Sequence, residues 1–169
     1  MASKVSAGAV ITESAHDFRD ALPSEGEEGG ALLGLDLGTK TIGIATCDAG
    51  WRFATAGKTL PRGKFTRDKN AMADLIAERS IAGIVIGLPR NMDGSTGARV
   101  QSSKAYAQNL AGALGLPILL WDERWSTLSA ERAMIDQDTS RAKRAERIDS
   151  HAAAIILQGA IDALAGSAI

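Results

Sequence analysis

The sequence predicts an α/β fold in which a mixed five-stranded sheet is flanked by helices. Three short β-type segments follow one another through tight turns near the start of the domain, which makes them antiparallel. Two later apolar segments each follow a segment with helical periodicity, the pattern of crossover units with parallel strands. Right-handed crossovers would place these two later strands beside the first strand.

The three antiparallel strands are predicted at residues 31–37, 41–48 and 51–60. The first is a short apolar run followed by Gly38, and the second alternates and is rich in β-branched residues. The sequence Asp48-Ala49-Gly50 is typical of a hairpin, so the third strand returns along the second.

The rest of the domain alternates between helices and buried strands. The continuous apolar run at residues 83–88 is typical of a strand that is covered on both faces. The expected elements are a helix at 67–80, a strand at 83–88, a helix at 96–114, a strand at 118–121, a helix capped by Ser126 or Thr127 that runs to about Gln137, and, after a basic loop, a last helix at 147–165.

The charges are divided unevenly between the start of the chain and the remainder. Residues 1–30 hold two basic and six acidic side chains and end in a segment rich in Gly and Glu. We therefore expect a flexible acidic tail at 1–30, with a short helical turn around 15–22, and a folded domain at 31–169. The domain holds 17 basic and 14 acidic side chains, and its basic clusters could neutralise phosphates, although such runs are often solvated loops.

Several classes of protein are excluded by simple features of the sequence. No apolar run approaches the roughly 20 residues that cross a bilayer, and no secretory signal is recognisable, so we expect no membrane association and a cytoplasmic location. The single cysteine, Cys47, cannot form an intrachain disulfide and is predicted to fill the core. The sequence leaves the oligomeric state open between a monomer and a homodimer.

Three carboxylates are predicted to converge. Asp36 lies at the end of the first strand and Glu123 at the end of a strand that the topology places nearby, where sites of α/β sheets collect. Asp149 lies in the first turn of the predicted last helix, which could direct it to the same strand ends. Each residue also has a structural alternative: a turn cap for Asp36, a surface salt bridge for Glu123, and a helix-dipole partner for Asp149.

Carboxylates that are packed together need a cation, because like charges otherwise raise one another's pKa. Ligand sets made only of oxygen favour Mg²⁺ or Mn²⁺. Two such ions about 4 Å apart can activate a water and stabilise the leaving oxygen of a phosphodiester. Asp36, Glu123 and Asp149 are therefore the candidate metal ligands.

The chain resembles the YqgF/RuvX family, whose members are described as Holliday-junction-resolvase-like proteins or pre-16S ribosomal RNA nucleases. The resemblance covers residues 32–162 and is carried by four blocks in order: Leu33–Ala45, Ile86–Ser95, Trp121–Thr127 and Ile148–Leu157. The sequence departs from the family pattern at Arg90, where an apolar residue is usual.

The resemblance implies a ribonuclease H-like fold and a metal-dependent nuclease that uses Mg²⁺ or Mn²⁺. The family's catalytic carboxylates correspond to Asp36, Glu123 and Asp149, the same three residues. The implied role is processing of the 5′ end of pre-16S rRNA in ribosome biogenesis, with resolution of branched DNA at Holliday junctions as the alternative.

Further polar residues near these carboxylates are candidates for substrate binding. Thr39 and Lys40 could also belong to a plain hairpin turn, Asn91 to an Asx-turn, and Arg124 could anchor Glu123 instead. For the tryptophans Trp51, Trp121 and Trp125, burial is favoured over stacking on bases. The candidate substrate-binding residues are Thr39, Lys40, Asn91, Arg124, Arg141, Lys143 and Arg144.

Two other classes of protein share some of these features. ATP-binding proteins of the actin class have similar phosphate loops, but they clamp nucleotide between two domains, and this chain has length for one. A non-catalytic RNA-binding module would be hindered by an acidic cluster.

Overall fold

The computed structural model describes residues 10–22, 30–89, 97–125 and 141–166, with residues 141–150 described by their backbone only. Its central sheet contains the long strands β2 (Ala31–Leu37), β3 (Thr41–Cys47), β6 (Ile81–Leu88) and β7 (Ile118–Asp122). The strand order across the sheet is β1-β7-β6-β2-β3-β4, with β5 also pairing with β3. The expected neighbours are confirmed: β3 is antiparallel to β2, and β6 and β7 are parallel additions on its other side.

The third antiparallel strand differs from its prediction. In place of one strand at 51–60, two short strands, β4 (Thr55–Ala56) and β5 (Leu60–Pro61), pair with opposite ends of β3. Ala56 pairs with Ala45 and Leu60 with Ile42, so the outer segment carries one residue more than β3 between these pairs. An extra residue of this kind is a bulge, and it interrupts the strand near Gly57.

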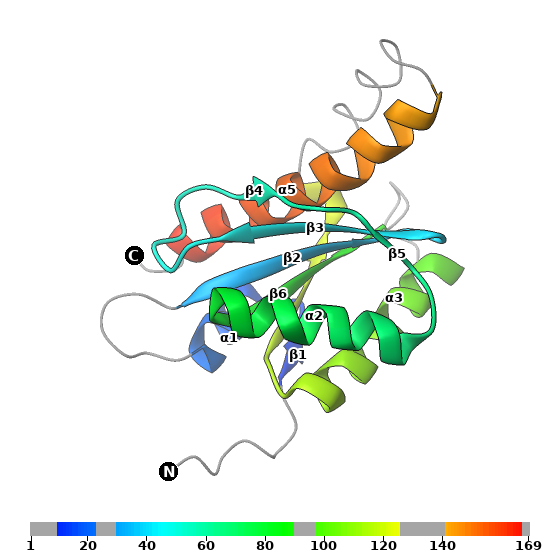
Figure 1. Ribbon diagram of the computed structural model, residues 1–169. Helices are drawn as coiled ribbons and strands as arrows, with labels where there is room; N and C mark the ends of the chain where they lie inside the picture. The colour runs from blue at the N-terminus through cyan, green and yellow to red at the C-terminus, as the bar shows by residue number, and fades with distance from the viewer. Residues whose placement is uncertain (1–9, 23–29, 90–96, 126–140, 167–169) are drawn as a thin grey trace.

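The two faces of the sheet are covered by different helices. Helices α2 (Phe65–Arg79) and α3 (Ala98–Leu114) lie on one face, and α5 (Arg141–Gly166) lies on the other (Figure 1). Alternate residues of β2 divide between the two cores, since Leu33, Leu35 and Leu37 pack with the first pair of helices while Leu32 packs on the side of α5. No helix in the described part of the chain is long and apolar enough to cross a membrane.

The last helix begins earlier than its sequence pattern indicates. The prediction places its start at 147 after a basic loop, but α5 begins at Arg141. The basic residues Arg141, Lys143 and Arg144 therefore lie within the first turns of this helix. Apolar periodicity locates a helix by its buried face, so a polar extension of the same helix is missed.

Part of the segment that is predicted as a flexible tail is folded onto the domain. Strand β1 (Ile11–Thr12) pairs in parallel with β7, and α1 (Ala15–Ala21) is capped by Ser14, whose side chain accepts a hydrogen bond from the Asp17 amide. Phe18 is completely buried, and it packs with Leu22 against β6 where Gly83 has no side chain. The segment is acidic overall, but its two large apolar residues Phe18 and Leu22 are part of the core.

Replacing Phe18 with Leu is expected to lower the free energy of unfolding by about 1–2 kcal/mol, because it removes buried apolar atoms and leaves a void. Urea unfolding followed by circular dichroism measures this change. Phe53→Leu is the matched control, since Phe53 is 76% exposed and its replacement is expected to cost less than about 0.5 kcal/mol. Equal effects of the two substitutions would mean that α1 does not contribute to the stable core.

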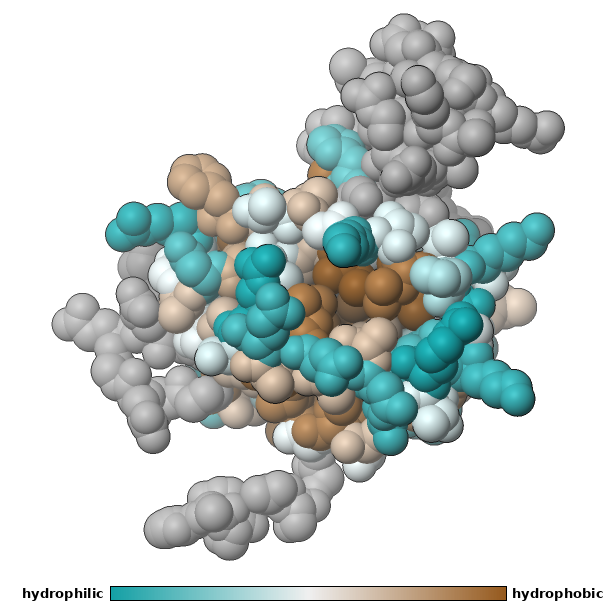
Figure 2. All heavy atoms as spheres, viewed as in Figure 1, coloured by the Kyte–Doolittle hydropathy of each residue, from teal (hydrophilic) through white to brown (hydrophobic). Residues whose placement is uncertain are grey.

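The surface on the side of α2 leaves part of the core uncovered. Figure 2 shows apolar residues gathered in a hollow between the outer strands and α2, surrounded by polar side chains. This groove, with a volume of about 360 Å³, has an apolar floor that includes Ile44, Leu60 and Leu75. These apolar side chains offer no hydrogen-bond donors to a polyanion.

Candidate active site

The parallel strands β2, β6 and β7 end at the same edge of the sheet. Their register aligns Leu35 with Ile86, and Ile86 with Leu120. The next residue on β2 is Asp36, and the next on β6 is Gly87, so these two lie beside one another about 4.8 Å apart. This edge of the sheet is where the sequence predicts the catalytic residues.

Asp36 is buried, with 4% of its surface exposed, and its position on β2 places it on the face covered by α5. Gly34, two residues earlier, faces Leu157 and Ala153 of that helix. On β3 the partner of Asp36 is Gly43, and on β6 its neighbour is Gly87. Neither glycine projects a side chain next to the carboxylate, and the place over Gly87 is taken by side chains of Glu123 and Ile156.

Glu123 reaches toward Asp36 across β6. It is the first residue of the short 3₁₀ helix η2 (Glu123–Trp125), which follows β7 directly. Its Oε1 lies only 2.9 Å from the position that a Cβ on Gly87 would occupy, next to Ile156 of α5. The carboxylate of Glu123 therefore lies over the strand beside Asp36, on the same face of the sheet.

The position of Asp149 is described by its backbone. Helix α5 runs in roughly the opposite direction to β2, and its N-terminal part extends past the end of the sheet (Figure 1). Asp149 lies one helical turn before Ala153, which packs over Gly34. It lies about two turns inside α5, so its predicted place in the first turn is wrong, and the alternative role as a partner of the helix dipole loses its basis. Its side chain lies outside the described part of the structure.

Arg124 is paired with Asp122. Strand β7 continues through Asp122, whose carboxylate accepts hydrogen bonds from Arg124 Nε at 3.1 Å and Nη2 at 2.7 Å. Asp122 is buried, and its side chain lies on the opposite face of the sheet from Trp121, as expected for successive residues of a strand. Arg124 thus clamps the end of β7, and this bidentate pair fixes the turn that carries Glu123.

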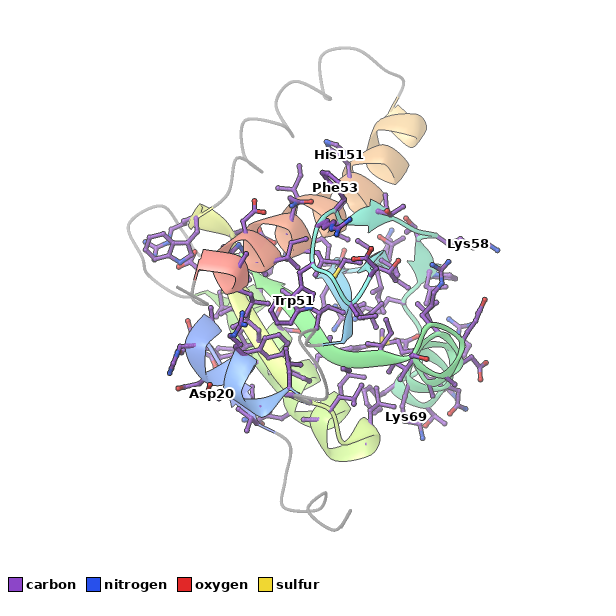
Figure 3. All side chains as sticks on the ribbon, turned by 90° about the vertical axis from the view of Figure 1, so that its left-hand side faces the viewer. Asp20, Trp51, Phe53, Lys58, Lys69 and His151 are labelled. Carbon is purple, nitrogen blue, oxygen red and sulfur yellow. The ribbon has the colours of Figure 1, made fainter. Side chains whose placement is uncertain are left out.

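Trp125 is exposed, contrary to the prediction that it is buried. It follows Arg124 in η2, 71% of its surface is exposed, and the Arg124 guanidinium lies 5.9 Å from its ring centroid. The other two tryptophans are partly buried, as predicted. Trp121 packs against Gly159, and Trp51 is partly buried with its indole donating to the Gly30 carbonyl. Figure 3 shows Trp51 directed inward and Phe53 at the surface.

Thr39 and Lys40 occupy the exposed turn between β2 and β3. The Gly38 amide donates to the Thr41 carbonyl at 2.9 Å and closes a tight hairpin. Both residues are therefore accessible at the end of the strand that carries Asp36. Asn91 and Arg90 lie outside the described residues, as do the side chains of Arg141, Lys143 and Arg144.

Cys47 is buried, which confirms that it fills the core. Burial raises the pKa of its thiol to about 11, so the thiol is protonated and unreactive at neutral pH.

Sequence patterns did not single out four residues of this edge. Gly43 is the partner of Asp36 on β3, and Gly87 on β6 makes room for the Glu123 carboxylate, roles that become visible only when three strands are in register. Arg62 and Arg99 contact the carbonyls of Gly38 and Leu37 at 2.7 Å and 3.3 Å. Arg62 belongs to a basic run that the sequence does show, whereas Arg99 is isolated and gives no signal.

Comparisons with known proteins agree closely. A family model described as "RuvX: Holliday junction resolvase" matches residues 30–163. A protein of Novosphingobium aromaticivorans is 67% identical over 159 residues, which cover 94% of this chain and 99% of that protein. A protein of Sphingopyxis alaskensis is 61% identical over 155 residues, with 92% and 99% covered. Both relatives carry names that make them candidate pre-16S rRNA nucleases.

Solved structures give the fold. RuvC of Thermus thermophilus in complex with a Holliday junction substrate matches with a TM-score of 0.53 and 13% identity, covering 82% of this chain and 97% of that one. A structure described as Thermus thermophilus RuvC matches with a TM-score of 0.50 and 14% identity, covering 80% and 96%. The predicted ribonuclease H-like α/β fold is confirmed.

Proposed function

The chain belongs to the RuvX family, described as Holliday junction resolvases, and on this premise we propose that it is a nuclease that hydrolyses phosphodiester bonds in the 5′-end processing of pre-16S rRNA. The observation that supports this best is the position of Glu123, whose Oε1 lies over Gly87 beside the buried Asp36. Two carboxylates on one face of the sheet, with Gly87 between them, suit a site that binds a cation and a phosphate.

The donor atoms at this edge suit a hard divalent cation. Asp36 and Glu123 offer only carboxylate oxygens, the ligands that Mg²⁺ and Mn²⁺ prefer. Within the described residues no group of three potential ligands is assembled, and Asp149 is the residue we propose as the third. When bound by these residues, such an ion would supply the activation of water and the stabilisation of the leaving oxygen.

The chain's own residues would position the substrate. Gly43, the partner of Asp36 on β3, carries no side chain that would hinder the approach of the sugar-phosphate backbone, whereas the place over Gly87 is taken by Glu123 and Ile156. The Asp122–Arg124 pair holds the turn of Glu123 in place. Trp125, exposed beside Glu123, offers a flat surface on which an unpaired base can stack. Thr39, Lys40, Asn91, Arg141, Lys143 and Arg144 are the remaining residues that we propose to contact the nucleic acid.

Our preference for an RNA substrate comes from the relatives that are 67% and 61% identical. An enzyme with this role would act in the cytoplasm, where ribosomes are assembled. The alternative is a resolvase that acts on DNA junctions, which the description of the family favours. A resolvase requires two symmetric cuts and therefore a homodimer, whereas an enzyme that trims RNA can act as a monomer.

A direct comparison of substrates tests the proposal. The purified full-length chain is incubated with Mg²⁺ and either a 5′-extended 16S precursor fragment or a four-way DNA junction of similar length. We expect the precursor to be cleaved at least roughly tenfold faster, which corresponds to an activation barrier lower by about 1.4 kcal/mol. Faster cleavage of the junction would favour the resolvase, and cleavage of neither substrate would contradict the proposed activity.

A further inference from the structure

A small polar pocket opens at the end of β2, on the opposite face from Asp36. Its volume is about 40 Å³, and its walls include Gly38, Thr39, Arg62, Arg99 and Ser102. Its lining also includes Leu37, the residue that follows Asp36 in the chain. The pocket is too small for a nucleoside but can admit the oxygen atoms of a single anionic group.

Two guanidinium groups reach this pocket from different elements. Arg62 follows β5, and its Nη1 donates to the Gly38 carbonyl at 2.7 Å. Arg99 lies in the first turn of α3, and its Nη2 donates to the Leu37 carbonyl at 3.3 Å. A guanidinium has five N–H donors, so one such contact leaves most of its donors available to a ligand.

The position of Arg62 is fixed by its packing. Its guanidinium lies 5.0 Å from the ring centroid of Tyr106. The Tyr106 hydroxyl donates to Oδ2 of the buried Asp68, while Oδ1 of Asp68 accepts from the Gly63 amide. Burial, and then the charge of Asp68, raise the pKa of Tyr106, so the phenol stays protonated and the network is stable at neutral pH.

The pocket carries the positive charge of two guanidinium groups. Among the residues that the structure describes, neither Arg62 nor Arg99 forms a salt bridge. The buried carboxylate of Asp68 is engaged by Tyr106 and Gly63. Exposed Thr39 and Ser102 add hydroxyl donors to the lining of the pocket. Arginine pairs whose planar forks remain available bind phosphate well, because they can donate two parallel hydrogen bonds.

We propose that the Arg62–Arg99 pocket binds a backbone phosphate of the substrate, adjacent along the strand to the phosphate that is cleaved at Asp36. This inference rests on the proposed nuclease function and adds to it a second contact across the end of β2. The strand of nucleic acid would pass over the Gly38–Thr39 turn, with one phosphate on each face of the sheet. The pocket would thereby set which phosphodiester reaches Asp36.

Binding without cleavage tests this contact. The affinity of the full-length chain for a fluorescent single-stranded RNA is measured by anisotropy, in EDTA and at several salt concentrations. Arg99→Gln is expected to weaken binding roughly tenfold, as a charge-assisted hydrogen bond is lost. The slope of log K against log salt is expected to fall by about 0.7, the value for one phosphate on a single strand.

Two further variants separate the contact from general effects of charge and stability. Arg79→Gln removes an equal charge at the end of α2 that precedes β6, at the opposite end of the sheet, and is expected to leave the slope unchanged. Arg99→Lys keeps the charge and is expected to retain the slope. An Arg99→Gln protein with wild-type affinity and slope would overturn the inference, as would an equal loss of slope in Arg79→Gln. If the wild-type chain cleaved neither substrate but Arg99→Gln still changed the slope, the proposed function alone would fail.

Discussion

Replacing Asp36 with Asn is expected to lower the rate of cleavage by roughly 10³-fold or more, because the substitution removes the charge that would hold the cation. The shape of the side chain hardly changes, so the sheet and α5 should pack as before. Asparagine keeps the size of this buried side chain, so the melting temperature without metal should change little. Cleavage rates of the precursor fragment and thermal unfolding by circular dichroism measure the two effects.

Asp74→Asn is a matched control for this substitution. Asp74 is an exposed carboxylate on α2, at the apolar groove on the other face of the sheet. Its amide variant is expected to cleave at the wild-type rate. Chelation of divalent ions by EDTA should reproduce the loss seen in Asp36→Asn, and added Mg²⁺ or Mn²⁺ should restore activity. Cleavage that persisted in Asp36→Asn or in EDTA would rule out the metal-dependent role of this residue.

The sheet was largely predictable because its strands are bounded by strong local signals. Apolar runs that end at Gly38 and at Pro89 define β2 and β6, and their order follows from the handedness of crossovers. The bulge near Gly57 was not predictable, since it depends on how the outer segment fits the twisted edge of β3. The docking of Phe18 was missed for a similar reason: it requires the space above Gly83, which is distant in the sequence.

The positions of candidate-site residues at the ends of strands could be predicted from the sequence. Contributions that depend on contacts between neighbouring strands could not. Asp36 and Glu123 could be found because each follows an apolar strand. The contribution of Gly87 could not be found, because a glycine in a strand has many explanations until its neighbours are known. The exposure of Trp125 is likewise a tertiary property, since composition alone favours burial of a tryptophan.

Replacing Gly87 with Ala is expected to lower the rate of cleavage by roughly 10²-fold, the scale on which small misplacements in active sites act. A Cβ at this position would lie 2.5 Å from Ile156 Cδ1 and 2.9 Å from Glu123 Oε1. The end of the Ile156 side chain can rotate away, whereas the Glu123 carboxylate must leave its place beside Asp36. The free energy of unfolding should fall by only about 1–3 kcal/mol, the usual cost of overpacking.

Gly83→Ala on the same strand separates the loss of cleavage rate from the loss of stability. Its Cβ would lie 2.7 Å from Leu22 and 2.8 Å from Phe18, so it overpacks the core to a similar degree at the opposite end of β6. It is expected to lose stability in urea unfolding but to keep the wild-type rate constant at a temperature where the protein is fully folded. If both alanine variants lost activity equally, general loosening of the sheet would explain the effect. Both variants disturb the same face of the same strand. A loss of activity in Gly87→Ala alone would therefore mean that the rate of cleavage depends on the position of the Glu123 carboxylate over Gly87.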